Sequence, residues 1–340
     1  MTRSSEKMFK IENKFLVLAF ALSFFAGSLL ADITRFDAVS PDGVNSIRLE
    51  LGVEGMKCST KPEGAIDLAS YNIRRAGMPD VGDRDWKVRL PKIVQVIEER
   101  GFEVVGFQEA FPQQVNDLEA ALKGWSHYGT GRFAGGLDEA APIFWNETRF
   151  KRISAGQFWL SETPDVAGSK SWDSKYPRIC TWAKLLDLET KKELCYFNCH
   201  LDHKGIAARR EGVKLILEKI GQIACGVPVV LGGDFNDEIV DDDLREKIRK
   251  VDRTRLTPKG PEHPIAIVKQ KMNDTREVSK AKPIGTYWTD NGYGEKHTKR
   301  IDYLFVSKGI DVLQYEVCRD RPDGIFPSDH EAVAVRIMFK

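Results

Sequence analysis

The sequence has few of the residues from which disulfide-rich and zinc-ribbon proteins are built. Its 340 residues include only 6 Cys and 6 His, and no two cysteines have the CxxC spacing that such proteins use. Neither sign of charge dominates, because 51 Lys and Arg stand against 50 Asp and Glu. A protein that wraps nucleic acid usually carries a basic excess. Repeats and low-complexity tracts are also absent, which leaves an ordinary globular composition with 42% hydrophobic and 10% aromatic residues.

Only one long uncharged hydrophobic run occurs, and it lies near the amino terminus. Residues 1–14 include several Lys and Arg, and the uncharged stretch 15–30 follows them directly. This order is typical of a secretory signal, whereas a full membrane span needs about 20 apolar residues. We therefore predict that residues 1–31 are a signal peptide, cleaved after Ala31 or Ser28, and that the protein is exported to the periplasm or secreted. Two alternatives stay open: an uncleaved membrane tether formed by residues 15–30, and a buried helix of the fold.

The cysteines show no pattern that specifies a cross-link. Cys195 and Cys199 lie on one face of a predicted strand, and the other cysteines are scattered along the chain. Export would permit a disulfide, but the spacing does not select one, so we expect buried free thiols. Metal ligation by these cysteines is not expected.

The remaining chain reads as a short β appendage followed by one large domain. Residues 32–64 contain a PDG turn and the alternating run SIRLELGV, which predicts a strand. In the large domain, residues 65–340, helical spacing of apolar residues predicts a helix that Gly101 ends and a second helix over 207–223. A polar segment at 254–281 predicts a long loop. Strands are expected at 65–74, 103–111, 141–146, 156–161, 178–188, 193–201, 227–235, 300–307 and 331–339.

Polar side chains that can bind metal or phosphate stand repeatedly where these strands end. One such residue means little, because Asp and Asn end strands for turn chemistry alone. Six stations in one chain indicate a cleft built on the ends of rigid strands. The six are Tyr71-Asn72, Gln108-Glu109, Asn198-Cys199-His200, Gly233-Asp234-Phe235-Asn236, Arg300-Ile301-Asp302 and Ser328-Asp329-His330.

In order and spacing, these stations resemble the endonuclease/exonuclease/phosphatase superfamily, which includes deoxyribonuclease I, inositol polyphosphate 5-phosphatases and neutral sphingomyelinases. The resemblance covers residues 65–340, and the stretch FWLSETP…PRICTW is similar to a bacterial branch of the superfamily. It implies an α/β fold in four layers, α-β-β-α. Two mainly antiparallel sheets would pack face to face, with helices outside and the active site at one rim.

The resemblance also implies metal-assisted attack of water on a phosphate ester. Glu109 would be the principal ligand of Mg²⁺ or Mn²⁺, and Asn72 and Asp329 would complete or support its coordination. Carboxylate and carboxamide oxygens suit such hard cations. The metal would neutralise charge on the phosphoryl and leaving oxygens.

Five further residues are assigned catalytic roles by the same resemblance. Asp302 and His330 would form a carboxylate–imidazole pair in which the carboxylate fixes the tautomer of the ring and raises its basicity. Asp234 would orient or deprotonate the attacking water. Asn236 would donate to a phosphate oxygen, and His200 would hold the phosphate or protonate the leaving group.

Two substrate-binding residues resemble positions of the deoxyribonuclease I branch. Glu139 would pair with His200, and Arg178 would contact phosphate; a solvent-exposed salt bridge is the alternative for each residue. The loops 77–85 and 161–177 replace elements that contact DNA in the nucleases. Because specificity lies in such loops, the substrate does not follow from the fold.

The function expected from these residues is divalent-metal-dependent hydrolysis of phosphate esters. A phosphodiesterase that acts on a small substrate or a chain end is favoured over a phosphatase, because Glu139 and Arg178 resemble a nuclease branch. The alternatives are a membrane-associated phospholipid or sugar-phosphate phosphatase, and a catalytically silent module that binds an anionic ligand.

The charge balance limits the partners that we expect. A nearly neutral chain suits contacts with one to three phosphates near His200, Arg178 and Asn236, with Trp172 and Tyr176 beside them, rather than an extended duplex. We expect a monomer that touches a membrane only if the signal segment is not cleaved. A nucleic-acid end or a lipid headgroup would satisfy the same chemistry.

Overall fold

The structure, a computed structural model, forms two units, residues 1–58 and 59–340. In the first unit, β1 (Arg35–Val39) pairs antiparallel with β2 (Ser46–Glu50). Both strands fall within the predicted β appendage, whose extent stays a prediction. The predicted signal peptide lies outside the described residues. Those residues are 35–39, 46–50, 60–77, 79–238, 257, 259–294 and 299–340.

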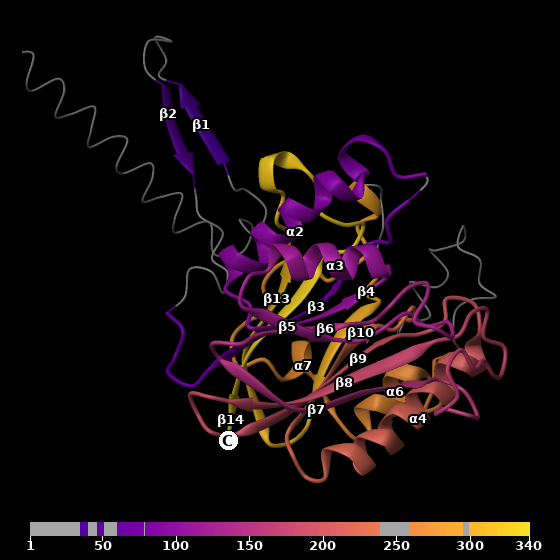
Figure 1. Cartoon of the computed structure of the whole chain (residues 1–340). Helices are drawn as coiled ribbons and strands as arrows, with labels where there is room; N and C mark the ends of the chain where they lie inside the picture. The colour runs from indigo at the N-terminus through magenta and orange to yellow at the C-terminus, as the bar shows by residue number, and fades with distance from the viewer. Residues whose placement is uncertain are drawn as a thin grey trace, which may run out of the picture. The chain divides into compact units, whose positions relative to one another are not determined.

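The second unit is built on two six-stranded sheets (Figure 1). One sheet has the strand order β11-β12-β10-β9-β8-β7, and the other has the order β13-β14-β3-β4-β6-β5. In each sheet a single neighbouring pair is parallel, β10 with β9 and β3 with β4. The expectation of two mainly antiparallel sheets is therefore confirmed.

Most ends of the predicted strands lie within one or two residues of the observed ends. The first sheet consists of β7 (Phe150–Trp159), β8 (Ile179–Asp187), β9 (Glu193–His200), β10 (Val229–Asp234), β11 (Asn273–Asp274) and β12 (Asp302–Val306). The second consists of β3 (Ile66–Asn72), β4 (Val104–Gln108), β5 (Trp125–Tyr128), β6 (Ile143–Asn146), β13 (Ile310–Cys318) and β14 (Ala332–Phe339).

Helices cover the outer face of each sheet, which completes the four layers that the resemblance implied. Figure 1 shows α2 and α3 over the sheet of β3 and β4, and α4 and α6 over the sheet of β8 and β9. No helix in the described part of the chain is long and apolar enough to cross a membrane. The helices are α2 (Trp86–Arg100), α3 (Pro112–Ala121), α4 (Ile206–Ala224), α6 (Pro264–Lys269) and α7 (Thr275–Val278), with 3-10 turns at Gly82–Arg84, Gly292–Gly294 and Pro322–Gly324.

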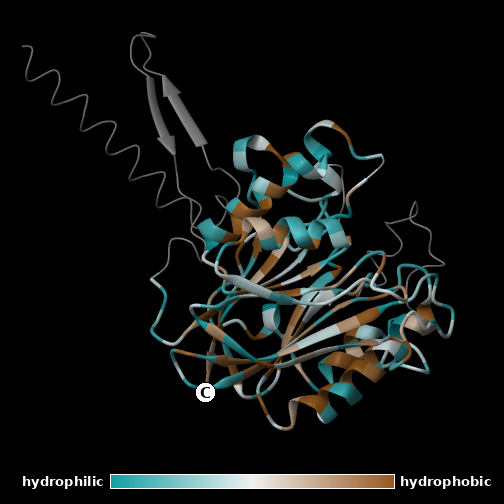
Figure 2. Cartoon of the chain, viewed as in Figure 1, coloured by the Kyte–Doolittle hydropathy of each residue, from teal (hydrophilic) through white to brown (hydrophobic). Residues whose placement is uncertain are grey.

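Burial of apolar side chains explains why these layers stay together. The main apolar cluster lies between the sheets and joins Leu68 of β3 to Leu185 of β8 and Leu304 of β12. A second cluster joins the outer face of the first sheet to α4 through Val213 and Ile216. Figure 2 shows both hydrophobic and hydrophilic stretches on the longer helices, as expected for helices with one face on a sheet.

The predicted helix ends have the local chemistry that the sequence indicated. In α2, the Asp85 side chain accepts a hydrogen bond from the Lys87 amide (2.8 Å), and Gly101 adopts φ 64 just past the last turn. Glycine tolerates this left-handed conformation best, so the predicted end of the helix is confirmed.

The sequence patterns missed β5, β13 and the first half of β7, and local irregularities explain the last two. β13 was not predicted, and β7 was predicted only in its second half. Both strands contain a register shift, between Val312 and Gln314 and between Arg152 and Ser154, which breaks the alternation of side chains. The predicted loop 254–281 was also wrong in part, since it contains α6, β11 and α7.

The five described cysteines are free thiols, as expected. Cys180, Cys195, Cys199 and Cys318 are buried, and only Cys225 is exposed. Burial raises the pKa of Cys195 to about 12, so this thiol stays protonated and unreactive at neutral pH.

A polar contact ties the two sheets together near the ends of their central strands. The Gln108 side chain donates to Asn198 Oδ1 (2.6 Å), and the Asn198 amide donates to the backbone carbonyls of Phe107 (2.7 Å) and Pro142 (3.1 Å). Gly106 makes this approach possible, because a Cβ there would lie 2.7 Å from Asn198 Cγ. The distance between the sheets at this end therefore depends on having glycine at position 106.

We expect Gly106→Ala to lower the free energy of unfolding by about 1–3 kcal/mol, because the added methyl overpacks the buried contact with Asn198. Gly221→Ala is the matched control: Gly221 lies in α4 with nothing within 4 Å of its would-be Cβ. That substitution should stabilise the protein by about 0.5–1 kcal/mol. Urea unfolding of both variants checks this, and equal effects would contradict the role given to Gly106.

Candidate active site

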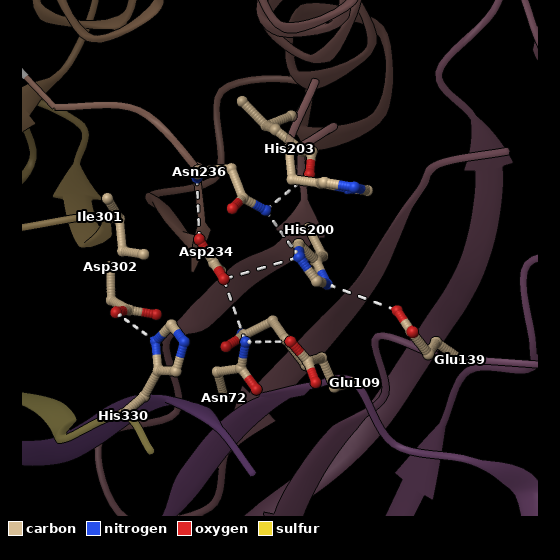
Figure 3. A network of polar contacts seen from close by, with 12 residues as sticks. Asn72, Glu109, Glu139, His200, His203, Asp234, Asn236, Ile301, Asp302 and His330 are labelled. Atoms are coloured by element: carbon tan, nitrogen blue, oxygen red, sulfur yellow. Dashed lines mark hydrogen bonds and ion pairs between the residues drawn. The ribbon is translucent and has the colours of Figure 1, made fainter. Parts of the chain in front are cut away.

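Strand pairing brings the predicted stations to one rim of the sandwich. In the first sheet, Asp234 at the end of β10 is in register with both His200 of β9 and Asp302 of β12. In the second sheet, Asn72 at the end of β3 is in register with Gln108, the residue before Glu109. Figure 3 shows these side chains converging from the two sheets.

Asn72 connects the two sheets within the site. Its side-chain amide donates to Glu109 Oε1 (3.1 Å) and to Asp234 Oδ2 (3.0 Å). Glu109 follows β4 with φ 61, an uncommon conformation for a residue other than glycine, and its second oxygen accepts from the Arg75 amide (3.1 Å). Burial acts to raise the pKa of Glu109, but the charge of His330 and the hydrogen bond from Asn72 lower it overall. Glu109 is therefore an ionised carboxylate whose position is fixed by hydrogen bonds from Asn72 and Arg75.

Asp302 and His330 form the predicted carboxylate–imidazole pair. His330 Nδ1 lies 2.8 Å from Asp302 Oδ2 and donates to it, and both side chains are buried. Burial acts to lower the pKa of His330, but the charge of Asp302 raises it well above the ordinary value. The other carboxylate oxygen, Asp302 Oδ1, is buried without a hydrogen-bond partner in the described structure. This unpartnered anionic oxygen faces a cost that a bound cation would relieve.

A threonine that the sequence did not reveal sets the position of Asp302. Thr289 is fully buried, and its Oγ1 accepts hydrogen bonds from the backbone amides of Ile301 (3.0 Å) and Asp302 (3.1 Å). The Glu331 amide donates to the Thr289 carbonyl (2.7 Å). Thr289 thus joins the segments that carry Asp302 and His330.

Asp234 is the most crowded carboxylate of the site. Burial and the nearby charge of Asp302 raise its pKa to about 7. Its Oδ1 accepts from the Asn236 amide (2.8 Å), and its Oδ2 lies 3.5 Å from His200 Nε2. A carboxyl group with this pKa can hold or accept a proton near neutral pH.

His200 is a neutral imidazole, and its neighbours determine which ring nitrogen carries the proton. The Asn236 side-chain amide can only donate to His200 Nε2 (2.8 Å), which leaves the ring proton on Nδ1. Nδ1 lies 3.9 Å from Glu139 Oε2. Burial and the charges of Arg178 and Arg132 lower the pKa of His200 well below its usual value. The predicted proximity of Glu139 to His200 is therefore present in the structure.

Glu139 and Arg178, the two predicted substrate-binding residues, are each held by hydrogen bonds to neighbouring side chains. Arg132 Nη1 donates to Glu139 Oε2 (2.8 Å). Arg178 donates through Nε to Asp202 (3.3 Å) and lies 2.9 Å through Nη2 from His203 Nδ1. Burial and the charge of Arg132 lower the pKa of Arg178. Arg178 is a buried, bonded guanidinium next to the site, and its role as a phosphate contact stays a prediction.

Asp329 lies beside Glu109 but faces an arginine. Its Oδ2 accepts from Arg74 Nη1 (3.2 Å), and Arg74 also bonds Asp80. Burial and the charge of Glu109 raise the pKa of Asp329, whereas Arg74 opposes this. The predicted part of Asp329 in holding a metal stays a prediction.

The donor set of this rim fits a divalent cation. Within the described residues, two groups have ligand atoms within 4.8 Å of one another: Glu109, His200 and Asp234, and Asp234, Asp302 and His330. Carboxylate oxygens predominate in both, as hard cations such as Mg²⁺ prefer. The unpartnered Oδ1 of Asp302 and the raised pKa of Asp234 both indicate negative charge that His330 offsets only in part. Asp329 belongs to neither group.

With fold and site described, the comparisons identify the class of protein. The Endonuclease/Exonuclease/phosphatase family matches residues 69–330, and the chain belongs to that family. Its members hydrolyse phosphate esters, so this protein is a phosphoric ester hydrolase.

The similar proteins include both solved structures and a viral relative. A mannosyl-6-phosphatase from Bacteroides thetaiotaomicron is 33% identical, with a TM-score of 0.70 over 81% of this chain and 100% of the other. A family protein from the same organism is 32% identical, with a TM-score of 0.70 over 82% of this chain and 99% of the other. An uncharacterized protein of Acanthamoeba polyphaga mimivirus is 22% identical over an aligned length of 181 residues, and the match covers 44% of this chain. The chain spans only 26% of that curated relative.

We expect His330→Ala and Asp234→Asn each to lower kcat for p-nitrophenyl phosphate by about 10²-fold or more, because each removes a proton-transfer group. His127→Ala is the control: His127 lies in β5 and stacks on Phe144 at 4.7 Å, so its loss should leave the rate close to wild type. A variant of either site residue with the wild-type rate and an unchanged thermal midpoint would show that its role is misassigned.

Proposed function

We propose that the protein is an exported, divalent-metal-dependent phosphatase that releases phosphate from a small, hydroxyl-rich phosphate monoester. The observation that carries this proposal is the pair of metal-competent groups that share Asp234, with the Asp302–His330 pair as part of the second group. Similarity to a mannosyl-6-phosphatase at 33% identity supports a sugar phosphate as the substrate class.

Glu109 and Asp302 would hold the metal, with Asn72 and Asp329 supporting them, which leaves Asp234 for proton transfer. A divalent ion at this position would supply Lewis-acid stabilisation of negative charge on the phosphoryl group. Mg²⁺ or Mn²⁺ fits the oxygen donors.

The protein's own side chains then account for orientation and proton transfer. Asp234, whose pKa is raised to about 7, orients the attacking water and takes its proton. His330 keeps Nδ1 on Asp302, so its Nε2 is the nitrogen that can exchange a proton or donate to phosphate. Asn236 and His200 would bind non-bridging phosphate oxygens by exchanging the hydrogen bond between them for bonds to phosphate, with His200 Nε2 taking up a proton from solvent in order to donate.

Phosphodiester cleavage at a chain end is the second candidate. The contact between Glu139 and His200 (3.9 Å) favours it, because this pair resembles the nuclease branch. Arg178 supports it through Nη1, which is buried without a hydrogen-bond partner in the described structure, whereas its Nε and Nη2 are bonded to Asp202 and His203. We place phosphate monoesters first because of the similarity to a mannosyl-6-phosphatase.

We expect the purified protein to hydrolyse mannose 6-phosphate and p-nitrophenyl phosphate faster than bis(p-nitrophenyl) phosphate. Activity should disappear in EDTA and return with Mg²⁺ or Mn²⁺, because oxygen-ligated ions of this kind are readily removed by a chelator. Full activity in excess chelator would refute the metal dependence. Faster turnover of the diester would favour the second candidate.

Export is proposed from the amino-terminal sequence alone. A basic segment before the uncharged run 15–30 supports a signal that directs the chain across a membrane. We expect amino-terminal sequencing of protein recovered from the periplasm or medium of an expressing bacterium to begin at Asp32 or Leu29. Protein confined to the cytoplasm, with an intact first residue, would contradict export, and membrane-bound protein with residues 15–30 retained would indicate a tether. Once released, we expect a monomer.

A further inference from the structure

One buried carboxylate fixes the loop that borders the site. Asp202 is only 1% exposed, and burial acts to raise its pKa, but the amide of Gly205 and the charge of Arg178 lower it to about 2. Asp202 is therefore ionised at neutral pH. Its two oxygens accept hydrogen bonds from Ser174 Oγ (3.2 Å), Lys175 N (3.0 Å), Tyr176 N (3.4 Å), Arg178 Nε (3.3 Å), Lys204 N (2.9 Å) and Gly205 N (2.8 Å).

The same loop is fixed a second time through α4. Asp173 Oδ1 accepts from the amide of Ala208 (2.7 Å), and Oδ2 accepts from that of Ala207 (3.2 Å), both in the first turn of the helix. A Cβ at Gly205 would lie 2.5 Å from Asp173 Oδ1, so only glycine leaves room for this contact. The segment from Asp173 to Arg178 is thus held at its backbone and at its side chains.

Tyr176 is the exposed residue that this framework presents. Its ring centroid lies 4.8 Å from the guanidinium carbon of Arg132 and 6.0 Å from the ring of His203. Those two neighbours are themselves bonded, Arg132 to Glu139 (2.8 Å) and His203 to Arg178 (2.9 Å). The Tyr176 side chain therefore has little freedom left to lose when a ligand binds.

The hydroxyl of Tyr176 is available to a ligand. The residue is 38% exposed, and within the described part of the chain its hydroxyl makes no hydrogen bond. By contrast, the hydroxyl of buried Tyr196 donates to the Ala69 carbonyl (2.8 Å). A phenol can donate one hydrogen bond and accept others, which matches the hydroxyl group of an alcohol.

A short series of contacts connects this hydroxyl-bearing ring to the phosphate end of the site. Glu139 lies 3.9 Å from His200 and is bonded to Arg132, which contacts the Tyr176 ring. Figure 3 shows His203 beside His200 and Asn236. A substrate whose phosphate lies at His200 and Asn236 and whose alcohol half extends along Glu139 and Arg132 would reach the Tyr176 ring.

We propose that Tyr176 is a specificity-determining residue whose hydroxyl hydrogen-bonds a hydroxyl group on the alcohol half of the substrate. This inference rests on the proposed phosphatase function and adds the group that selects hydroxyl-rich alcohols such as monosaccharides. A site built to bond a substrate hydroxyl discriminates strongly against analogues that lack it, because its own polar group is then left unpaired.

The test compares two substrates in two matched variants. In Tyr176→Phe, the ratio of kcat/KM for mannose 6-phosphate to that for p-nitrophenyl phosphate should fall about tenfold, the effect of losing one hydrogen bond. Tyr287→Phe is the control, because Tyr287 is also 38% exposed but packs on Arg276 and Arg300. Its ratio should match wild type, and thermal midpoints of both variants should match wild type as well.

The other possible results distinguish failure of the hydroxyl subsite from failure of the proposed phosphatase function. An unchanged ratio in Tyr176→Phe, or an equal fall in both variants, would overturn the hydroxyl subsite and leave the phosphatase standing. Wild-type protein that hydrolyses only p-nitrophenyl phosphate would do the same. Wild-type protein that hydrolyses neither monoester with Mg²⁺ or Mn²⁺ would overturn the proposed function and the subsite with it.

Discussion

Repulsion between buried carboxylates is the constraint around which the site is organised. Glu109, Asp234 and Asp302 meet at one rim, where burial makes each additional negative charge more costly. The protein offsets part of this cost with amide donors from Asn72 and with the charge of His330. The raised pKa of Asp234 reflects the part of the repulsion that these groups do not offset. Such crowding destabilises a fold unless the backbone that carries it is rigid, which explains why each of these carboxylates stands at or beside a strand end.

The two sheets supply that rigidity through pairing that leaves no freedom of register. A slip of one residue between β9 and β10 would move His200 away from Asp234 and turn its side chain to the other face. The bond between Gln108 and Asn198 holds the sheets at one separation near the same rim. Positions in the strands and positions in the site are therefore determined by the same contacts.

Sequence patterns predicted the six stations because each is local: a buried strand followed by a polar residue that can bind metal or phosphate. The fold class followed from the resemblance that these stations carry. The sequence did not reveal three residues that support the site: Arg132, Asp202 and Thr289. Their roles depend on contacts between segments far apart in the chain, such as the bond from Arg178 to Asp202, and no local pattern marks such contacts. β13 was missed for another reason, since its bulge removes the alternation that identifies a strand.

The double attachment of the substrate loop has a consequence for how this enzyme can diversify. Asp173 and Asp202 tie the base of the loop to α4 and to the end of β9. The preceding residues 162–172 lie outside these ties, so insertions or exchanges there would leave the base of the loop and His200 in place. Changes at the base would disturb recognition and catalysis at once. Insertions are thereby directed to the tip, as in scaffolds whose variable loops rest on fixed stems.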